Sequence, residues 1–436
     1  CPHVFVDGHV YRTNTFPNGA FRGFGAPQAI WALESHIDRC ASALGMTPEG
    51  FRLRNALHLG DATATGQVLS EPMGTPDVLE KTLARSDFTR KRARCSRGDP
   101  SAKKWYGIGL AFFGHGSGFT GDGESRLKAK AALDLELLDD GAPGVNIRIS
   151  STEMGQGTFT IMPQIAADGL GLPMARVRCP HPDTKYVPDS GPTVASRTTM
   201  VVGSTVFGAA QKLKTLLETY ASETYFGGAP AELVDGRFRN RYTTDTQSFD
   251  AVARRLIQER GPQRVYNQFQ LPPTIKWDQK TFRGDSYPSY SWGCNVAEVE
   301  IDPLTLELKV TKITSVWDIG RLINPVLAKG QIEGGLVQAL GYAVMEKIGI
   351  KDGLYDASRM QTYVVPTALD VPDMIVEFIE YPYTHGAPGA KGVGEIPMDG
   401  LAPAIANAVE AATGHRITDL PITPEKLLAS RELQAT

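Results

Sequence analysis

The chain has 436 residues, which is enough for two or more domains of ordinary size. Its 42% hydrophobic residues, 21% charged residues and net charge of -3 are those of an ordinary globular protein, and no basic block could follow a phosphate backbone, so we exclude nucleic acid as a partner. No stretch approaches the roughly 20 apolar residues of a membrane-spanning helix and no leader-like segment opens the chain, so we expect a cytoplasmic location without a membrane span.

The first part of the chain predicts two helices followed by a polar connection. Apolar residues recur at helical spacing over residues 27–44, and a cap and first turn begin a second helix over residues 47–57. Residues 86–104 are dense in Arg and Lys and lack an apolar period, which indicates a solvated connection. We place a domain boundary in this connection and divide the chain into residues 1–95 and 96–436.

The second part of the chain mixes strands with helices. Alternating apolar residues on both sides of a turn predict a β-hairpin over residues 133–149, and alternation also predicts half-buried strands at residues 296–301 and 304–310. Helical periodicity is found in four further segments: residues 158–170, 201–225, 331–345 and 402–413. Because hairpins and helices are interspersed without a regular βαβ alternation, we expect the fold class α+β, with mixed sheets and packed helices.

Four glycine-flanked segments could present side chains or backbone to a ligand: residues 19–25, 153–157, 194–199 and 391–397. Taken singly, each is better explained by ordinary loop geometry. The second and third segments share a physical logic, because each opens a helix and offers unpaired amides and a positive dipole end to an anion such as phosphate. Neither matches the GxxxxGK[ST] or GxGxxG pattern, so a nucleoside triphosphate or NAD site is not supported.

Glu395 stands in a stretch that has no other charge until Asp399. This predicts a carboxylate in apolar surroundings, unpaired by any cation, and such burial suits it to proton abstraction near neutral pH. A glutamate that caps the helix following Asp399 explains the sequence at least as well.

Aromatic residues and an arginine are further candidates for ligand contact. Phe24 and Phe119 could enclose a flat substrate, and Arg22 could hold an anionic oxygen or a phosphate by its planar guanidinium. Core packing is the commoner role for both phenylalanines.

Metal ligation by histidine or cysteine is not indicated. The histidines lack the pairing of a zinc site: His115, His181 and His385. The cysteines are too far apart for a CxxC site or an iron–sulfur cluster and predict free, buried thiols: Cys1, Cys40, Cys95, Cys179 and Cys294. The residues after Cys1 have the pattern of a segment inside a structure, so we expect a preceding subunit or a removed piece.

Considered together and in this order, these motifs resemble the molybdenum-cofactor portion of the xanthine dehydrogenase and aldehyde oxidase family of molybdenum hydroxylases. The resemblance runs nearly end to end, through residues 13–15, 20–25, 152–157, 190–196, 318–320, 324–325, 330–334, 394–395 and 423–426. It implies two molybdenum-cofactor-binding domains, the first only partly present: residues 1–95 would hold its end and connecting helices, and residues 96–436 the second domain.

The resemblance also implies roles for individual residues. Glu395 resembles the family's catalytic base, which takes the proton of the attacking oxygen nucleophile, and Arg22 is its catalytic companion. Arg22 and Ala195 resemble residues next to the molybdenum, which has no direct protein ligand. The residues that resemble cofactor contacts are Gly155, Gln156, Gly157, Ala195, Ser196, Arg197, Thr198, Thr199 and Gln331. The residues that resemble substrate contacts are Phe24, Phe119 and Thr120.

The family's molybdenum domain has an earlier half, which this chain does not carry. The resemblance therefore implies a split enzyme, completed by a second molybdenum-binding subunit, an iron–sulfur subunit with a 2Fe-2S cluster, and a flavin subunit with FAD. The cofactor expected on this chain is molybdopterin in its cytosine dinucleotide form.

The reaction that the resemblance favours is hydroxylation of an aromatic N-heterocycle, such as a purine or a pyridine carboxylate, with water as the oxygen source. An aldehyde oxidoreductase of the same family is the nearest alternative. A non-catalytic cofactor-binding assembly subunit, or a small-molecule binding module without a redox metal, also stays open.

Overall fold

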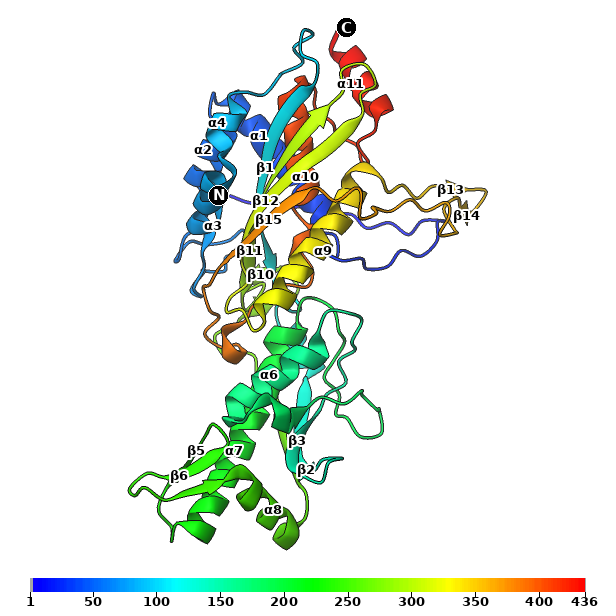
Figure 1. Cartoon of the computed structure of the whole chain (residues 1–436). Coiled ribbons are helices and arrows are strands. Elements are labelled where there is room, and N and C mark those ends of the chain that lie inside the picture. The colour runs from blue at the N-terminus through cyan, green and yellow to red at the C-terminus, as the bar shows by residue number, and fades with distance from the viewer. Residues whose placement is uncertain (1–2, 436) are drawn as a thin grey trace.

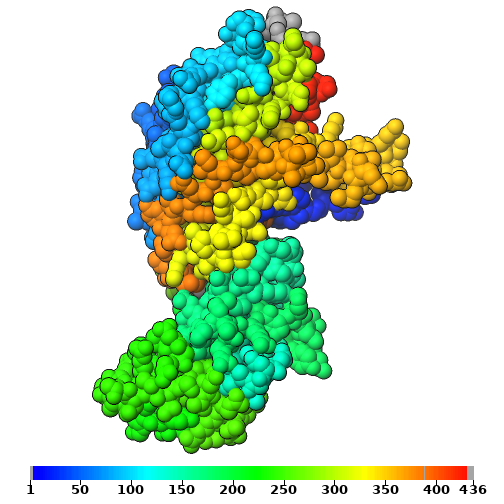
Figure 2. Space-filling view, viewed as in Figure 1, coloured from blue at the N-terminus to red at the C-terminus, as the bar shows by residue number. Residues whose placement is uncertain are grey.

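The computed structural model describes residues 3–435, and all of their side chains except those of residues 387 and 430–435. Cys1, on which the expectation of a preceding segment rests, lies outside the described residues. The described chain forms two bodies joined by a narrower waist (Figures 1 and 2). The upper body contains residues 3–116 and 290–435, and the lower body contains residues 130–268.

The upper body is built on a four-stranded mixed sheet of strand order β1-β11-β12-β15. Its strands are β1 (Trp105–Gly116), β11 (Tyr290–Ile301), β12 (Leu308–Asp318) and β15 (Asp373–Ile379). The first three pair antiparallel, and β15 joins β12 in parallel. The helices of this body are α1 (Ala26–Ala43), α2 (Pro48–Asn55), α3 (Thr75–Ser86), α4 (Phe88–Arg92), α9 (Pro325–Val344), α10 (Leu401–Thr413) and α11 (Pro424–Ala435).

Helices cover both faces of the upper sheet. α10 packs on β1 and β11 and shares one apolar core with α9, whereas α3 and α4 enclose a second core on the other face. β1 and α10 approach closely because β1 carries glycines at the contact: a Cβ on Gly107 would stand 2.0 Å from the carbonyl oxygen of Ala408, and one on Gly109 would stand 2.2 Å from the Ala408 amide nitrogen. This close packing fixes the end of β1, from which the cavity described below is lined.

The lower body is built on a second mixed sheet of strand order β4-β3-β2-β8. Its strands are β2 (Lys130–Leu137), β3 (Pro143–Arg148), β4 (Val177–Arg178) and β8 (Gln263–Gln268), and a small second sheet holds β5 (Ala231–Val234), β6 (Arg237–Asn240) and β7 (Thr246–Ser248). Its helices are α6 (Thr158–Leu170), the 3-10 turn η1 (Met174–Arg176), the π-helical turn η2 (Thr198–Val202), α7 (Gly203–Tyr225) and α8 (Phe249–Arg260). α6 and α7 pack together and on the sheet, which gives this body its own apolar core.

Short elements complete the chain. They are α5 (Gly123–Leu127), β9 (Trp277–Asp278), β10 (Arg283–Gly284), β13 (Ile350–Lys351), β14 (Leu354–Tyr355) and the 3-10 turns η3 (Ala387–Gly389) and η4 (Ile396–Met398). β13 and β14 belong to an arm that projects sideways beside the N-terminal segment (Figure 1), where the ring of Phe16 stacks on that of Tyr355 at 4.7 Å between centroids. None of the helices in the described part of the chain combines the length and apolarity needed to cross a membrane.

The predicted fold class and the long helices are confirmed. Both main sheets contain parallel and antiparallel pairs, and the predicted hairpin is the pair β2–β3. α1, α2, α6, α7, α9 and α10 occupy the predicted helical segments, and Thr47 caps α2 by accepting a hydrogen bond from the Gly50 amide at 3.1 Å. The four cysteines of the described residues are free, although only Cys294 is fully buried.

Three local predictions are wrong. Residues 86–104 are not simply a solvated connection, because they include α4, whose Phe88 is fully buried. β11 is buried on both faces and not on one, because α10 covers one face and α3 the other. The second predicted strand begins at Leu308 and not at residue 304, because the turn after Ile301 extends through Leu306, which has a positive φ.

Candidate active site

A cavity of about 1190 Å³ lies where the two bodies meet. Its lining comes from the loop before α1, the end of β1, the turns before α6 and η2, one face of α9, and the loop before η4. All four glycine-flanked segments contribute to it. The tertiary structure therefore brings to one place segments that are hundreds of residues apart in the sequence.

The guanidinium of Arg22, from the loop before α1, forms hydrogen bonds to α9 and to the loop before η4. Its Nε donates to the Gly394 carbonyl at 2.5 Å, its Nη1 donates to Oε1 of Gln338 at 2.9 Å, and its Nη2 donates to the Gln331 carbonyl at 3.1 Å. Burial lowers the pKa of Arg22, while Glu395 and Asp399 act in the opposite direction. Arg22 thus places a fixed positive charge beside the Glu395 loop.

Gln338 was missed in the sequence analysis. It lines the cavity from α9, together with Gln331 and Gly334. Because Gln331 and Gln338 are seven residues apart, about two helical turns, they lie on the same face of the helix. Helical spacing from Gln331 could have identified it.

Glu395 lies in the cavity lining immediately before η4. Its amide donates to Oγ of Ser196 at 2.9 Å, and its side chain is 16% exposed. The side chain makes no capping hydrogen bond to η4, and α10 begins only at Leu401. The alternative role as a helix cap is therefore not what the structure shows.

The expectation that Glu395 is unpaired by any cation is wrong. Nε2 of His115 lies 3.4 Å from Oε2 of Glu395, and Nδ1 of the same ring lies 2.6 Å from Oδ2 of Asp399. Asp399 is fully buried. Sequence reasoning missed His115 because no local pattern signals a pair whose members are 284 residues apart.

The turn before α6 already contains its own anion. The carboxylate of Glu153 accepts hydrogen bonds from the amides of Gly155 at 2.8 Å, Gly157 at 3.0 Å and Phe159 at 3.1 Å, and these bonds lower its pKa despite an opposing effect of burial. The expected unpaired amides at this helix end are therefore occupied. Gly155 and Gln156 line the cavity, whereas Gly157 does not.

The turn before η2 is different. Ala195 and Ser196 both have left-handed backbone conformations, with φ of 55° and 51°, which non-glycine residues adopt only where the surroundings enforce them. Thr198 and Thr199 follow at the N-terminus of η2, where backbone amides have no carbonyl from a preceding turn. This second helix end keeps the anion-binding character that the sequence suggested.

The side chain of Arg197 is not available to bind an anion. It is fully buried in an ion pair with Glu124, with a shortest distance of 2.9 Å, and its Nη1 donates to the carbonyls of Ser190 and Pro192. Any contact between Arg197 and a cofactor would therefore come from the backbone of Arg197.

The predicted substrate contacts also line the cavity. Phe24 is 74% exposed and lies at a positive φ of 47°, and Phe119 and Thr120 follow shortly after the end of β1. Thr120 donates to the hydroxyl of Tyr287 at 2.9 Å.

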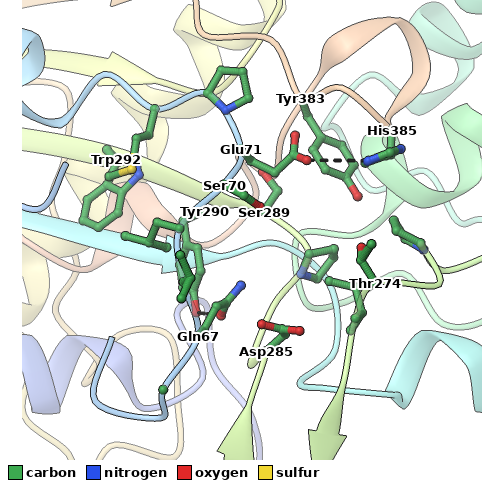
Figure 3. Close-up of a pocket in the computed structure, with 18 residues that line it drawn as sticks. Gln67, Ser70, Glu71, Thr274, Asp285, Ser289, Tyr290, Trp292, Tyr383 and His385 are labelled. Atoms are coloured by element: carbon green, nitrogen blue, oxygen red, sulfur yellow. Dashed lines mark hydrogen bonds and ion pairs between the residues drawn. The ribbon is translucent and has the colours of Figure 1, made fainter. Parts of the chain in front are cut away.

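A smaller pocket of about 290 Å³ lies beside residues 66–73 and the start of β11 (Figure 3). There Glu71 accepts a hydrogen bond from Oγ1 of Thr384 at 2.7 Å and lies 3.6 Å from Nε2 of His385. The hydroxyls of Ser289 and Tyr383 are buried there without a hydrogen-bond partner. None of the predicted site residues lines this pocket, so we assign the chemistry to the larger cavity.

This fold and cavity define the class of protein. A family model for the molybdopterin cofactor-binding domain matches residues 81–372, and a second model of the same description matches residues 1–56. The chain belongs to the molybdenum hydroxylase family, with the molybdenum-binding subunits of the xanthine dehydrogenase and aldehyde oxidoreductase type.

Three relatives illustrate the likeness. The xanthine dehydrogenase molybdenum-binding subunit of Escherichia coli O157:H7 is 31% identical over 98% of this chain and 55% of its own length, and the aldehyde oxidoreductase of Megalodesulfovibrio gigas is 29% identical over 98% and 43%. The crystal structure of quinoline 2-oxidoreductase from Pseudomonas putida 86 superposes with a TM-score of 0.82 at 26% identity, over 95% of this chain and 53% of the other. The chain thus spans about half the length of these relatives.

The cavity residues fit a molybdopterin cofactor. A Cβ on Gly155 or on Gly334 would meet no atom within 4 Å, so both glycines leave open space where a side chain would enter the cavity. Thr198 and Thr199 at the start of η2 line the same space, and backbone amides at such a helix end suit a phosphate. Among the described residues, no group of three or more His, Cys, Asp or Glu side chains is arranged to hold a metal ion directly.

Proposed function

We propose that this chain is the molybdenum-binding subunit of a hydroxylase that oxidises an aromatic N-heterocycle, such as a purine or a pyridine carboxylate, with water as the source of oxygen. The observation that carries the proposal is Glu395, a carboxylate held in the lining of the cofactor-sized cavity between Arg22 and His115. Two of the three relatives named above take their names from aromatic N-heterocycles, xanthine and quinoline. This supports a heterocyclic substrate over an aldehyde.

The residues that would hold the cofactor lie on the turn before η2 and on the facing segments. The amides of Ser196, Thr198 and Thr199 would bind its phosphate, with Arg197 contributing through its backbone. The loop backbone of Ala195 and the guanidinium of Arg22 would lie nearest the metal. The other proposed contacts are Gly155, Gln156 and Gln331, which line the cavity.

When bound, the cofactor supplies the oxygen nucleophile and takes up the two electrons of the oxidation. The protein supplies orientation and proton removal. Glu395 accepts the proton of the nucleophile at its carboxylate, and Arg22, which donates to the Gly394 carbonyl, holds the loop that carries it. Phe24, Phe119 and Thr120 orient a flat ring and exclude water from one side of the cavity.

Other parts of the active complex would come from partner subunits. We propose an iron–sulfur subunit with a 2Fe-2S cluster and a FAD subunit, in a cytoplasmic complex. We further propose that the pterin carries a cytosine dinucleotide, and that the two cofactor-binding domains of this chain divide at residue 95.

The test is Glu395→Gln in the assembled holoenzyme. Loss of a general base costs about 100-fold to 10,000-fold in rate, so kcat on the heterocycle should fall by that amount with little loss of bound molybdenum. Glu300→Gln, which changes an exposed carboxylate of β11, is the matched control and should leave kcat unchanged. Retention of activity in Glu395→Gln would show instead that the chain is a non-catalytic cofactor-binding subunit.

A substrate panel separates the heterocycle from the aldehyde. We expect turnover of at least one purine, quinoline or pyridine carboxylate by the holoenzyme. Turnover of aldehydes with no activity on any heterocycle would establish the alternative suggested by the Megalodesulfovibrio gigas relative.

A further inference from the structure

His115 lies at the end of β1 with both ring nitrogens directed at carboxylates. Nδ1 stands 2.6 Å from Oδ2 of Asp399, and Nε2 stands 3.4 Å from Oε2 of Glu395. A neutral imidazole has a single N–H donor, so it would turn a lone pair toward one of the two carboxylates. Only the doubly protonated ring donates to both.

The charges around this ring balance. Asp399 is fully buried, and its second oxygen, Oδ1, has no hydrogen-bond partner, so His115 is its sole compensation by direct contact. From the loop before α1, Arg22 contributes the other positive charge near both carboxylates. From the loop before β11, the ring of Tyr287 packs against Gly116, the residue after His115.

We propose that His115, anchored by Asp399, is a positioning residue that orients the Glu395 carboxylate into the cavity. This inference rests on the proposed function, in which Glu395 is the base. It adds a second pair of residues, drawn from β1 and from the segment after η4, to the machinery of that base.

The protonation of His115 agrees with this geometry. Burial lowers the pKa of His115, but the hydrogen bonds to Asp399 and Glu395 outweigh burial and raise the pKa to about 9. Burial raises the pKa of Asp399 to about 6, against the opposing hydrogen bond from His115. Between these two values the pair carries an imidazolium and a carboxylate, so the ring keeps one N–H on Asp399 and directs the other toward Glu395.

Removing the imidazole should leave the Glu395 carboxylate free to turn away from the cavity. In His115→Gln we expect kcat to fall by about 100-fold with KM little changed, because a catalytic group displaced by about 1 Å can cost that much in rate. Asp399→Asn keeps the ring but removes the carboxylate that anchors it, so kcat should fall in the same direction and by less.

A second measurement follows His115 itself and needs no turnover. Deuterium exchange at the imidazole Cε1 position, followed by peptide mass spectrometry on the assembled enzyme, gives the titration midpoint of a single histidine. We expect a midpoint near pH 9 for His115 in the wild-type enzyme and a lower midpoint in Asp399→Asn. His58, an exposed histidine 3.6 Å from Asp61, is an internal control for the exchange conditions in the same samples.

The thermal stability of the enzyme should also depend on the protonation of His115. The folded-state pKa of His115 lies above the value of 6.5 for an unperturbed histidine, so its protonation stabilises the fold below about pH 6.5 and this contribution is lost as the pH rises through about 9. The melting temperature of the wild-type enzyme should therefore fall over this interval more than that of His115→Gln.

The outcomes separate this inference from the proposed function. If Glu395→Gln abolishes turnover but His115→Gln keeps the kcat of the wild-type enzyme, Glu395 is the base and His115 does not position it. A wild-type His115 midpoint near 6.5 overturns the inference even if no His115 variant folds. If Glu395→Gln keeps full activity, the proposed function fails first, whatever the histidine titration shows.

Discussion

Lys391 and Asp318 form a buried ion pair that anchors the loop carrying Glu395. Nζ of Lys391 donates to Oδ2 of Asp318 at 2.8 Å and to the Pro72 carbonyl at 2.8 Å, and both side chains are at most 1% exposed. Burial raises the pKa of Asp318 and lowers that of Lys391, against the attraction between them. Each charge therefore depends on the other to remain in the interior.

Replacing one partner should destabilise the chain strongly. In Lys391→Met the buried Asp318 carboxylate loses its cation, and breaking a buried pair in this way costs about 3–5 kcal/mol in the free energy of unfolding. Urea denaturation would measure this loss. In the control Lys104→Met, which breaks an exposed pair with Glu300, the change should stay below about 1 kcal/mol. Equal losses in the two variants would contradict the anchoring role of Lys391.

At the scale of elements, glycines allow helices to approach the site. On α9, Gly335 faces the Arg22 guanidinium and η4: a Cβ there would stand 2.4 Å from Cβ of Pro397 and 3.1 Å from Cζ of Arg22. On the same helix, Gly330 has no atom within 4 Å of the place where a Cβ would be. Two glycines of one helix therefore differ in their surroundings: a side chain at Gly335 would clash, whereas a side chain at Gly330 would not.

The two glycines predict opposite effects of alanine. Gly335→Ala should cost about 1–3 kcal/mol in stability by overpacking and should also lower kcat, because Arg22 must shift away from the Glu395 loop. Gly330→Ala should instead stabilise α9 by about 0.5–1 kcal/mol, since alanine is the better helix former. Thermal denaturation and steady-state kinetics on both variants would check this, and a stabilised, fully active Gly335→Ala enzyme would refute the packing argument.

At the scale of the whole molecule, the cavity exists only because two separately packed bodies meet. The upper body contributes Arg22, His115 and Glu395, and the lower body contributes the turns before α6 and η2. Each body has its own apolar core. A ligand that spans the cavity contacts both bodies and should stabilise their arrangement.

Removing the molybdenum cofactor from the holoenzyme should therefore lower its melting temperature. A ligand that binds only the folded state stabilises it by about 2.7 kcal/mol at a hundredfold excess over Kd. Amide hydrogen exchange at residues 194–199 should become faster in the cofactor-free enzyme, whereas exchange in the β2–β3 hairpin should not change. An unaltered melting temperature and unaltered exchange at residues 194–199 would place the cofactor elsewhere.

The sequence by itself determined the elements whose signals are local. Helices such as α1 and α10 show an apolar period, the β2–β3 hairpin shows alternation around a turn, and the motif around Glu395 marked a candidate base. β1 escaped detection because its glycines interrupt the alternation, and they are there to admit α10. The glycines of β1 are explained by the helix that packs on them, and the sequence of the strand alone does not reveal that helix.

Only the tertiary structure decided which charges meet. The sequence suggested unpaired amides before α6, but the carboxylate of Glu153 folds back onto them. The sequence also suggested an isolated Glu395, but His115, which lies 280 positions earlier in the chain, contacts its carboxylate. Local patterns record the period of a helix or strand, whereas the pairing of buried charges depends on contacts between distant segments that packing alone brings within a few ångströms.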